Sequence, residues 1–314
     1  YRIGVGYTAT TGAIEEVVLG RPYVSHVFEI GSGWDGTHVK DPFVLYDAGT
    51  WKMWYSGYDG TKYQIGYATS VDGIIWTRSG SNPVLVVGAG GTFDASGCSF
   101  PIVYKDAGAA SDKRYRLLYT GKNGSGVYQI GYAYSADGIS WTKGSGNPVV
   151  AVAASSWESA GVLTGTLVKS GSTYYLYYGG TSSVAFREPW QGGLATFTDF
   201  EGTYTKDAGN PILVRRTGDQ ALAANLSAGG ASVQVADSSG FVVGEVVWIT
   251  DGTNGQQVAI SAIPDSTHIT IADVANAAYT TANGSRIQTA LLAVLPRTVV
   301  LEGGSWRMWL TGFQ

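Results

Sequence analysis

A unit of about sixty residues recurs along this chain, and this recurrence constrains the fold more than any other feature. An Asn-Pro pair closes three of the copies, and Pro83, Pro148 and Pro211 are 65 and 63 residues apart. A fourth proline, Pro22, lies 61 residues before Pro83. A chain that repeats itself at such a spacing is expected to form similar units packed side by side.

The copies contain aromatic-rich apolar segments, and the first two also carry a turn motif. In the first copy the segments are residues 40–46, 51–57 and 63–70, and a Ser-x-Asp-Gly-x-x-Trp motif occupies residues 70–76. The alternating or wholly apolar pattern of these segments predicts short β-strands. Four-stranded units repeated around an axis form a β-propeller, and this is the architecture that we predict.

The fourth copy is divided between the two ends of the sequence. The second copy covers residues 100–150, the third covers residues 165–213, and the fourth combines residues 296–312 with residues 1–24. Strands from both termini would then complete one unit and close the ring, which removes a free sheet edge. Four blades are therefore visible in the sequence, and a fifth requires residues beyond either end.

Composition favours an all-β fold and argues against several classes of function. Glycine makes up 45 of 314 residues and aromatic residues 12%, which suits many strands joined by tight turns. The net charge is −4 without a basic cluster, and no apolar run is long enough for a membrane helix. We therefore expect neither a nucleic-acid partner nor a membrane partner.

The sequence also gives no sign of a metal or a cofactor. A single cysteine, Cys98, excludes an internal disulfide, and the three histidines lack the spacing of metal ligands. Glycine-rich phosphate loops and nucleophile-elbow motifs are missing as well. We expect the protein to work without a metal and without a cofactor.

Residues 219–288 interrupt the fourth copy and differ from it in composition. They are rich in Ala, Gly, Ser and Thr, and Phe241 and Trp248 are their one notable aromatic pair. We predict that they form a small inserted β-domain, and that residues 1–218 and 289–314 form the propeller. The segment resembles small β modules of bacteriophage structural and tail proteins, and two roles stay open for it: shaping a sugar cleft or docking to a larger assembly.

Two sets of acidic residues recur with the repeat, and we interpret both as structural. Asp72 and Asp137 lie in the turn motifs, where an aspartate accepts hydrogen bonds from nearby backbone N–H groups. Asp35, Asp94 and Glu158 each follow an aromatic residue and precede the first strand of their copy by the same spacing. A group present in every repeat normally serves the repeat itself.

Asp41 is an acid that breaks this regularity. It lies before Pro42 at the start of a first strand, near the expected central channel. The matching positions of the other copies hold Phe100, Thr164 and Leu295. An ionised group at an apolar channel mouth is costly unless it is paired or used. Two interpretations stay open, an ion pair with the adjacent Lys40 or a functional carboxylate.

Several loop residues are expected on the same face as Asp41. These candidates for substrate binding are His38, Lys40, Tyr58, Asp59, Lys122 and Asn123, together with Arg187, Glu188 and Trp190 of the longest loop. Aromatic rings on such a face match the apolar C–H faces of sugars. The alternative for the longest loop is a local ion pair beside a packed tryptophan.

The repeat resembles a known family. Lys-Asp-Pro at residues 40–42, Trp-Lys-Met-Trp-Tyr-Ser-Gly at residues 51–57, the run from Ile65 to Trp76 and Asn-Pro-Val-Leu at residues 82–85 are similar to the repeat of the five-bladed propeller glycosidases, glycoside hydrolase families 43 and 32. The resemblance covers the chain outside residues 219–288. It implies a propeller whose catalytic acids come from the first strands of different blades.

Carried over to this sequence, the resemblance gives Asp41 the place of a transition-state stabiliser, with Lys40 where arginine is usual. The matching positions of the other two family acids hold no acid, and the loop carboxylates Asp59 and Glu188 are the candidates to substitute for them, with Glu188 the catalytic partner that we predict. Two classes stay open. One is a divergent glycoside hydrolase; the other is a propeller that binds glycans without cleaving them, or has a structural role, in a phage tail, a virion or a cell-surface assembly. Both predict an extracellular or virion-associated location.

Overall fold

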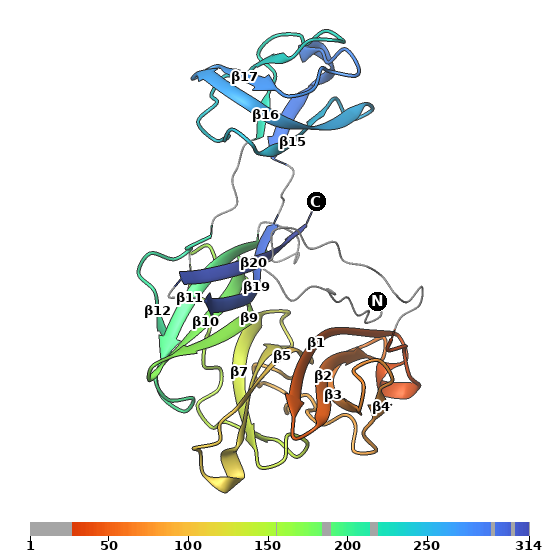
Figure 1. Ribbon diagram of the computed structural model, residues 1–314, viewed down its shortest axis with the longest axis vertical. Coiled ribbons are helices and arrows are strands. Elements are labelled where there is room, and N and C mark those ends of the chain that lie inside the picture. The colour runs from red at the N-terminus through yellow and green to blue at the C-terminus, as the bar shows by residue number, and fades with distance from the viewer. Residues whose placement is uncertain are drawn as a thin grey trace. The chain divides into compact units, whose positions relative to one another are not determined.

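The computed structural model describes residues 27–154, 156–183, 190–213, 219–289, 293–302 and 305–313. These ranges contain twenty strands and three short 3-10 helices (Figure 1). The all-β class expected from the sequence is therefore confirmed. No helix within these ranges has the length and apolarity needed to cross a membrane. The chain divides into two compact units, and one of them consists mainly of residues 213–294.

Three repeats each fold into a four-stranded antiparallel meander (Figure 1). The first repeat contains β1 (His38–Asp47), β2 (Thr50–Tyr58), β3 (Tyr63–Ser70) and β4 (Thr77–Arg78). The second contains β5 (Gly97–Lys105), β6 (Tyr115–Lys122), β7 (Tyr128–Ser135) and β8 (Thr142–Lys143). The third contains β9 (Gly161–Ser170), β10 (Thr173–Thr181), β11 (Trp190–Phe197) and β12 (Thr205–Lys206). A further antiparallel pair is β19 (Ala293–Glu302) and β20 (Ser305–Phe313). The number of blades and the closure of the ring by both termini stay predictions.

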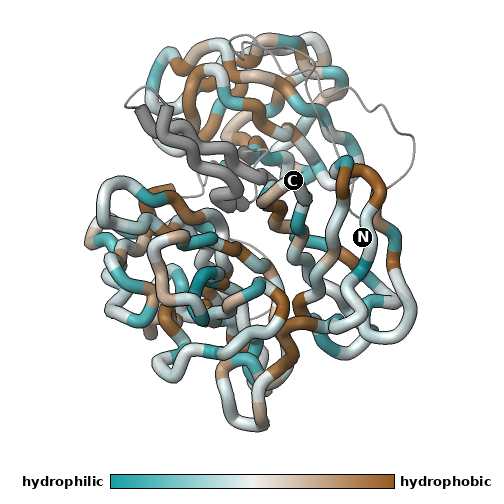
Figure 2. The backbone as a smooth tube through the Cα atoms, turned by 60° about the horizontal axis from the view of Figure 1, so that its bottom comes forward, coloured by the Kyte–Doolittle hydropathy of each residue, from teal (hydrophilic) through white to brown (hydrophobic). Residues whose placement is uncertain are grey.

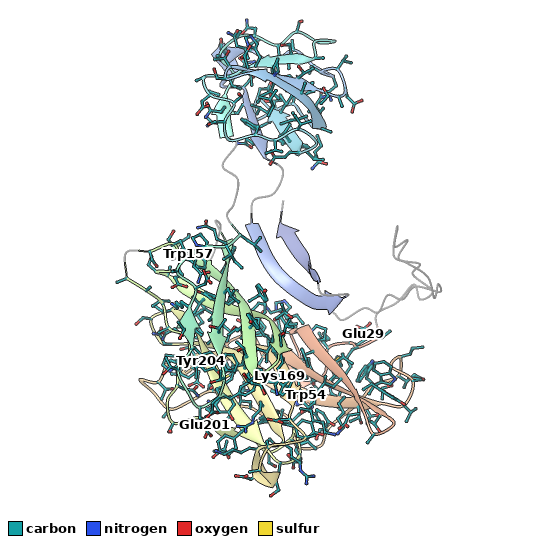
Figure 3. The ribbon with its side chains drawn as sticks, turned by 60° about the vertical axis from the view of Figure 1, so that its left-hand side comes forward. Glu29, Trp54, Trp157, Lys169, Glu201 and Tyr204 are labelled. Atoms are coloured by element: carbon teal, nitrogen blue, oxygen red, sulfur yellow. The ribbon has the colours of Figure 1, made fainter. Side chains whose placement is uncertain are left out.

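Hydrophobic side chains fill the space between neighbouring repeats. Brown, hydrophobic stretches recur throughout the strands in Figure 2, separated by polar turns. Trp54 of β2 is fully buried and belongs to a cluster that includes Tyr115 and Leu117 of the next repeat. Its indole N–H donates to the carbonyl oxygen of Gly138 at 2.7 Å. Figure 3 labels Trp54 among the side chains of the strands. Burial of each such side chain stabilises the fold by about 1.5–3 kcal/mol.

An aromatic residue ahead of each repeat packs onto two glycines of that repeat. A Cβ atom at Gly66 would lie 2.4 Å from Cη2 of Trp34, and one at Gly57 would lie 2.3 Å from Cζ3 of the same ring. The same arrangement joins Phe93 to Gly121 and Gly131, and Trp157 to Gly180 and Gly193. The high glycine content therefore has a packing reason in addition to the turns.

The acid that follows each of these aromatic residues is buried and contacted from two strands. Asp35 Oδ2 accepts hydrogen bonds from the Tyr55 hydroxyl at 3.0 Å and from Arg78 Nε at 2.8 Å. The equivalent partners are Tyr119 and Lys143 for Asp94, and Tyr178 and Lys206 for Glu158. The structural interpretation of these three acids is confirmed.

The turn motifs behave as their sequence predicts. Asp72 Oδ1 accepts the backbone N–H groups of Ile74 and Ile75, each at 2.8 Å, and the Ser70 hydroxyl donates to the same oxygen. Asp137 makes the corresponding bonds in the second repeat. Both carboxylates therefore stabilise a hairpin turn.

The second unit has its own sheet and its own core. Its strands are β13 (Asp219–Ala221), β14 (Ser232–Gln234), β15 (Val246–Thr250), β16 (Gly255–Asp265), β17 (His268–Ile271) and β18 (Arg286–Thr289), in the order β13-β18-β15-β16-β17-β14. Val247, Ile249 and Ile287 are fully buried in a cluster formed entirely within this unit. The domain bounds expected from the sequence stay a prediction.

Candidate functional site

The first strands of the three repeats leave regular pairing at the same place. The bulged residues are Asp41-Pro42 in β1, Phe100-Pro101 in β5 and Gly165 in β9. Proline lacks a backbone N–H, and a bulge is one of the few places in a sheet where that loss is tolerated. A bulge also redirects the side chains next to it, so these residues are turned out of the regular strand pattern.

Two of the bulged residues have a left-handed backbone. The φ angle is 52° for Asp41 and 51° for Phe100. Aspartate tolerates this conformation because its side chain is short and polar, whereas for a bulky residue it is unusual. The Phe100 N–H donates to Ser56 Oγ at 3.0 Å, which holds that backbone in place. Strain of this kind is concentrated at functional sites.

A hollow of about 400 Å³ opens where these strand starts meet. The residues around it are Asp41, Pro42, Phe43, Phe100, Pro101, Ile102, Thr164 and Gly165. Asp41 is the single carboxylate among the described residues that line it. We call this space the Asp41 hollow. It combines one acid with apolar and aromatic walls, which is the usual character of a small-molecule site.

Lys40 supplies a positive charge beside the Asp41 hollow. Its ammonium nitrogen lies 3.5 Å from Asp41 Oδ2, and the Asp41 side chain is 13% exposed. The same nitrogen lies 4.5 Å from the ring centre of Tyr63 and 4.9 Å from that of Phe100. Cation–π contacts on both rings therefore hold the ammonium group between them. The ion pair anticipated from the sequence is present.

Three aromatic rings form a stack on the same edge of the first repeat. The rings of His38 and Tyr58 are 5.4 Å apart and nearly parallel, and those of Tyr58 and Tyr63 are 4.4 Å apart. The register of the sheet explains this, because His38 pairs with Tyr58 and Tyr58 with Tyr63. We call these rings the aromatic stack. Tyr63 was missed by sequence reasoning, although its position just after the Tyr58 turn could have indicated it.

Asp59 and Asn123 shape the turns in which they lie. Asp59 Oδ1 accepts the Thr61 N–H at 2.7 Å and also the Thr61 hydroxyl, and these bonds hold the pKa of Asp59 below its usual range. Asn123 Oδ1 accepts the N–H groups of Ser125 and Val127. Hydrogen bonds within each turn thus explain why a polar residue lies there.

Of the remaining candidates, Lys122 and Trp190 are among the residues that the structure describes. Lys122 ends β6 with its ammonium nitrogen 5.5 Å from the ring centre of Tyr128, and Trp190 is 6% exposed at the start of β11. Neither Lys122 nor Trp190 is among the described residues that line the Asp41 hollow. Arg187 and Glu188 lie outside the described residues. The functional roles of these four residues stay predictions.

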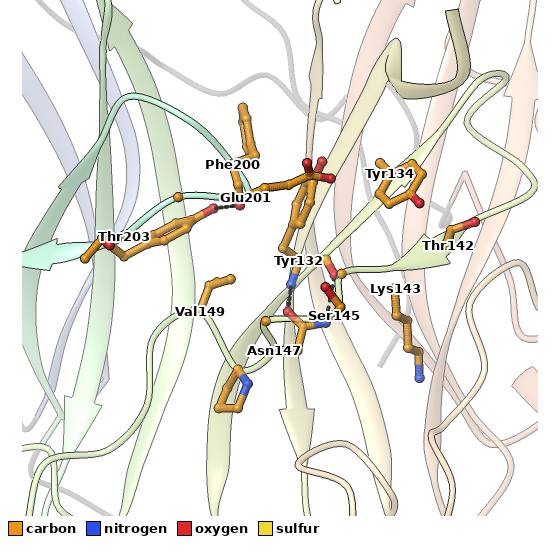
Figure 4. A pocket seen from close by; sticks show the side chains of 15 residues that line it. Tyr132, Tyr134, Thr142, Lys143, Ser145, Asn147, Val149, Phe200, Glu201 and Thr203 are labelled. Atoms are coloured by element: carbon orange, nitrogen blue, oxygen red, sulfur yellow. Dashed lines mark hydrogen bonds between the residues drawn. The ribbon is translucent and has the colours of Figure 1, made fainter. Parts of the chain in front are cut away.

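A larger hollow of about 630 Å³ lies between the second and third repeats (Figure 4). Two of its polar residues, Asn147 and Glu201, already have partners. The Asn147 amide is bonded to both backbone groups of Tyr132, and the carboxylate of Glu201 lies 2.6 Å from the Lys113 ammonium group. We therefore assign the candidate site to the Asp41 hollow. Within the described ranges, no group of three or more acids, histidines or cysteines is arranged to hold a metal ion.

The chain has distant relatives among known proteins. No family model matches the chain. Two curated proteins from strains of Mycobacterium tuberculosis, both named as uncharacterized, are each 30% identical to it over 132 residues. That match spans 40% of this chain and 40% of each relative.

Solved structures with a similar fold include glycoside hydrolases. One is Zg3597, a family 117 glycoside hydrolase produced by the marine bacterium Zobellia galactanivorans, with a TM-score of 0.50 at 17% identity over 89% of this chain and 79% of that one. Another is a BT0996 RGII complex, with a TM-score of 0.50 at 16% identity over 84% of this chain and 73% of that one. At these identities the likeness establishes the fold alone.

Proposed function

We propose that this chain, which has the fold of the propeller glycosidases, is a carbohydrate-active protein that receives a glycan at the Asp41 hollow. One observation carries the proposal. A carboxylate on a left-handed, bulged backbone lines a hollow with Phe43 and Phe100, beside Lys40 and the aromatic stack. The repeat explains the bulge, but it does not explain the acid, because Phe100 holds the same position in the next copy.

The chemistry of these groups suits a sugar. Tyr58 lies between His38 and Tyr63, so the aromatic stack can offer a sugar its ring edges and the outer face of an end ring, which matches the C–H face of a pyranose or furanose ring. Lys40 donates hydrogen bonds and Asp41 accepts them, so the pair can bind neighbouring hydroxyl groups from both sides. A site that combines ring faces with a few polar groups fixes both the position and the orientation of a ligand.

Glycoside hydrolysis needs a second carboxyl group. One of the pair donates a proton to the leaving oxygen, and the other activates water or attacks the anomeric carbon directly. We propose Asp41 as one member and Glu188 as the other, with Arg187 and Trp190 of the same loop binding the substrate. In the role that the family resemblance implies, Asp41 stabilises the positive charge that develops on the sugar.

A second candidate function is glycan binding without cleavage. It is favoured because Asp41 is the single acid in the described lining of the hollow, while Asp35, Asp94 and Glu158 are contacted by a tyrosine and a cation. In that case the propeller would attach a phage tail, a virion or a cell-surface assembly to a glycan. Under both candidates we expect the protein to be extracellular or virion-associated.

The test is a panel of polysaccharides and oligosaccharides scored for binding and for released reducing ends. Wild type is compared with Asp41→Asn and Glu188→Gln, and Asp112→Asn, an exposed acid of the 3-10 helix Ser111–Lys113, serves as the control for loss of a charge. Product released by wild type and the control but by neither site variant supports a hydrolase. Binding that only Asp41→Asn loses, without product, supports the second candidate. Neither binding nor product on any glycan overturns the proposal.

A further inference from the structure

The strained backbone of Phe100 is held on both sides by buried hydroxyl groups. A bulky residue keeps a φ angle such as the 51° of Phe100 only where the surrounding structure imposes it. The Phe100 N–H donates to Ser56 Oγ of β2 at 3.0 Å, and its carbonyl oxygen accepts from the Thr164 hydroxyl of β9. Ser56 and Thr164 are both buried. The backbone of Phe100 is thus bonded to the first repeat and to the third.

A third buried hydroxyl, that of Thr120 in β6, completes this network. Thr120 Oγ1 accepts the Thr164 N–H at 3.0 Å and lies 3.1 Å from Thr164 Oγ1. A hydroxyl group has one proton to donate. Because Thr164 donates its proton to the Phe100 carbonyl oxygen, Thr120 is the donor in the contact between the two hydroxyls. The hydrogen bonds therefore run from Thr120 through Thr164 to Phe100, and bonds in such a chain strengthen one another.

We call Ser56, Thr120 and Thr164 the hydroxyl clamp. Ser56 and Thr120 occupy matching positions of their repeats, each directly before a glycine. The matching position of the third repeat holds Gly179, so a repeat folds without such a hydroxyl. What the clamp adds is a fixed backbone at Phe100, where three repeats meet.

The hydroxyl clamp is joined to the charged groups of the Asp41 hollow through Phe100. Both Phe100 and Thr164 line that hollow. The ring centre of Phe100 is 4.9 Å from the ammonium nitrogen of Lys40, and the same nitrogen is 3.5 Å from Asp41 Oδ2. A displacement of Phe100 would therefore change the surroundings of Lys40 and its distance from the carboxylate.

We propose that Thr164 is a positioning residue of the Asp41 hollow. By holding the Phe100 carbonyl oxygen, Thr164 fixes the phenyl ring that keeps Lys40 beside Asp41. Its own hydroxyl is committed to Phe100 and Thr120, so it acts through Phe100 and not directly on a ligand. The expected effect on glycans rests on the proposed function, whereas the effect on Phe100 requires no ligand.

The alternative is a network that only joins the three repeats. Buried hydroxyls with satisfied hydrogen bonds stabilise a fold wherever they occur, so a loss of stability does not separate the two roles. Thr181 offers a matched control. It is a fully buried threonine of the third repeat, its hydroxyl oxygen accepts the Ser183 N–H at 3.1 Å, and it is not among the described residues that line the hollow.

The experiment compares the full-length wild type, Thr164→Val, Thr164→Ser and Thr181→Val by two readouts. The first is the ¹⁹F NMR resonance of 4-fluorophenylalanine incorporated in place of Phe100, which reports the surroundings of that ring without a ligand. The second is binding and cleavage of the glycan panel. Thermal unfolding of each variant is recorded alongside.

Thr164→Val keeps the shape of the side chain and removes its hydroxyl. It should shift or broaden the fluorine resonance and weaken the response to glycans about 10-fold or more, as small misplacements in a binding site do. Thr164→Ser restores the hydroxyl and should return both readouts close to those of wild type. Thr181→Val should lower the melting temperature and leave both readouts unchanged.

Ser56→Ala keeps the proposal testable if Thr164→Val does not fold. It removes the acceptor of the Phe100 N–H and should change both readouts in the same direction. An unchanged fluorine resonance in the folded variants would overturn the proposal, as would a glycan response of Thr164→Val equal to that of Thr181→Val and wild type. If wild type responds to no glycan, the proposed function fails. A change in the resonance that Thr164→Ser reverses would then still support the positioning of Phe100 by Thr164, and no change would overturn it.

Discussion

Asp41 and Phe100 occupy the same bulged position in consecutive repeats, and both have a left-handed backbone with φ angles of 52° and 51°. The two repeats therefore share a strained backbone at this position but differ in side chain, an acid in one and a phenyl ring in the other. The two side chains now meet the same hollow and the same lysine, Lys40. Equivalent positions of two repeats thus meet at one site, and one of these two positions carries the charge.

Substitutions of Asp41 should separate its backbone role from its chemical role. Asparagine also tolerates a left-handed backbone, so Asp41→Asn should change the free energy of unfolding by about 0.5 kcal/mol or less. Alanine does not, and Asp41→Ala should cost about 1 kcal/mol more than asparagine. Both variants should lose glycan binding or cleavage to the same extent. Chemical denaturation and the glycan assay measure the two effects separately, and a large loss of stability in Asp41→Asn would mark the carboxylate as structural.

The buried acids of the repeat should behave in the opposite way. Asp94→Ala leaves Lys143 and the Tyr119 hydroxyl without their common partner. Because the Lys143 side chain is 27% exposed and water can reach it, we expect a loss of about 2 kcal/mol in unfolding free energy. Asp112→Ala is the control, since that acid is exposed, and it should change stability little. A folded Asp94→Ala protein should respond to glycans as wild type does, which a role in catalysis would not allow.

Asp47 connects the first two repeats and makes their association sensitive to acid. Its carboxylate is bonded to Lys105 at 2.5 Å, to Lys52 at 2.7 Å and to the Tyr115 hydroxyl at 2.8 Å. These hydrogen bonds hold the pKa of Asp47 far below its usual range. Such a group adds stability that is fully present above its unfolded pKa of about 3.9 and is lost as the pH falls towards the folded value.

Unfolding free energies should show this dependence directly. Wild type should be more stable than Asp47→Asn by a constant amount from about pH 7 to about pH 5, and the difference should shrink below about pH 4. Urea denaturation at each pH is the measurement. An exposed acid without such partners, Asp112, gives the control in Asp112→Asn. A difference that grows on acidification would have the wrong sign and would exclude the assigned pKa shift.

The glycines of the repeat give a test of packing. A Cβ atom at Gly131 would lie 2.3 Å from Cζ of Phe93 and 2.9 Å from Cζ of Tyr119, whereas one at Gly124 meets nothing within 4 Å. Gly131→Ala should therefore destabilise the protein by about 1–3 kcal/mol, and Gly124→Ala should be nearly neutral. Differential scanning calorimetry of both variants decides this. Equal melting temperatures would show that the rings can move aside.

The sequence predicts the repeats well because each repeat carries its own local signals. The Asp of the turn motif, the aromatic-acid pair and the Asn-Pro pair recur at fixed positions, and each forms the same contacts in every described copy. Comparison of the copies also singled out Asp41, because the matching positions of the other copies hold no acid. The stacking of His38, Tyr58 and Tyr63 depends on strand register, which a single position in the sequence does not reveal.

The functional roles of the polar loop residues stay predictions, because each of these residues also has a local structural role. Asp59 and Asn123 were chosen because they lie on the expected face, yet their oxygens accept backbone N–H groups of their own turns. The sequence alone does not distinguish an aspartate that stabilises a turn from an aspartate that binds a ligand. Only the hydrogen-bond partners distinguish them, and those partners are fixed by backbone conformation.

The inserted segment should be removable. Within the second unit Asp219 pairs with Gln288, so the two ends of residues 219–288 lie side by side on adjacent strands. Replacement of the segment by a short Gly-Ser bridge spans only the distance between paired strands, about 5 Å. The shortened protein should remain folded, with cooperative unfolding and the β-sheet circular dichroism of the repeats, and should respond to soluble glycans as the full chain does. An insoluble or unfolded product would show that the repeats depend on this segment for their own stability.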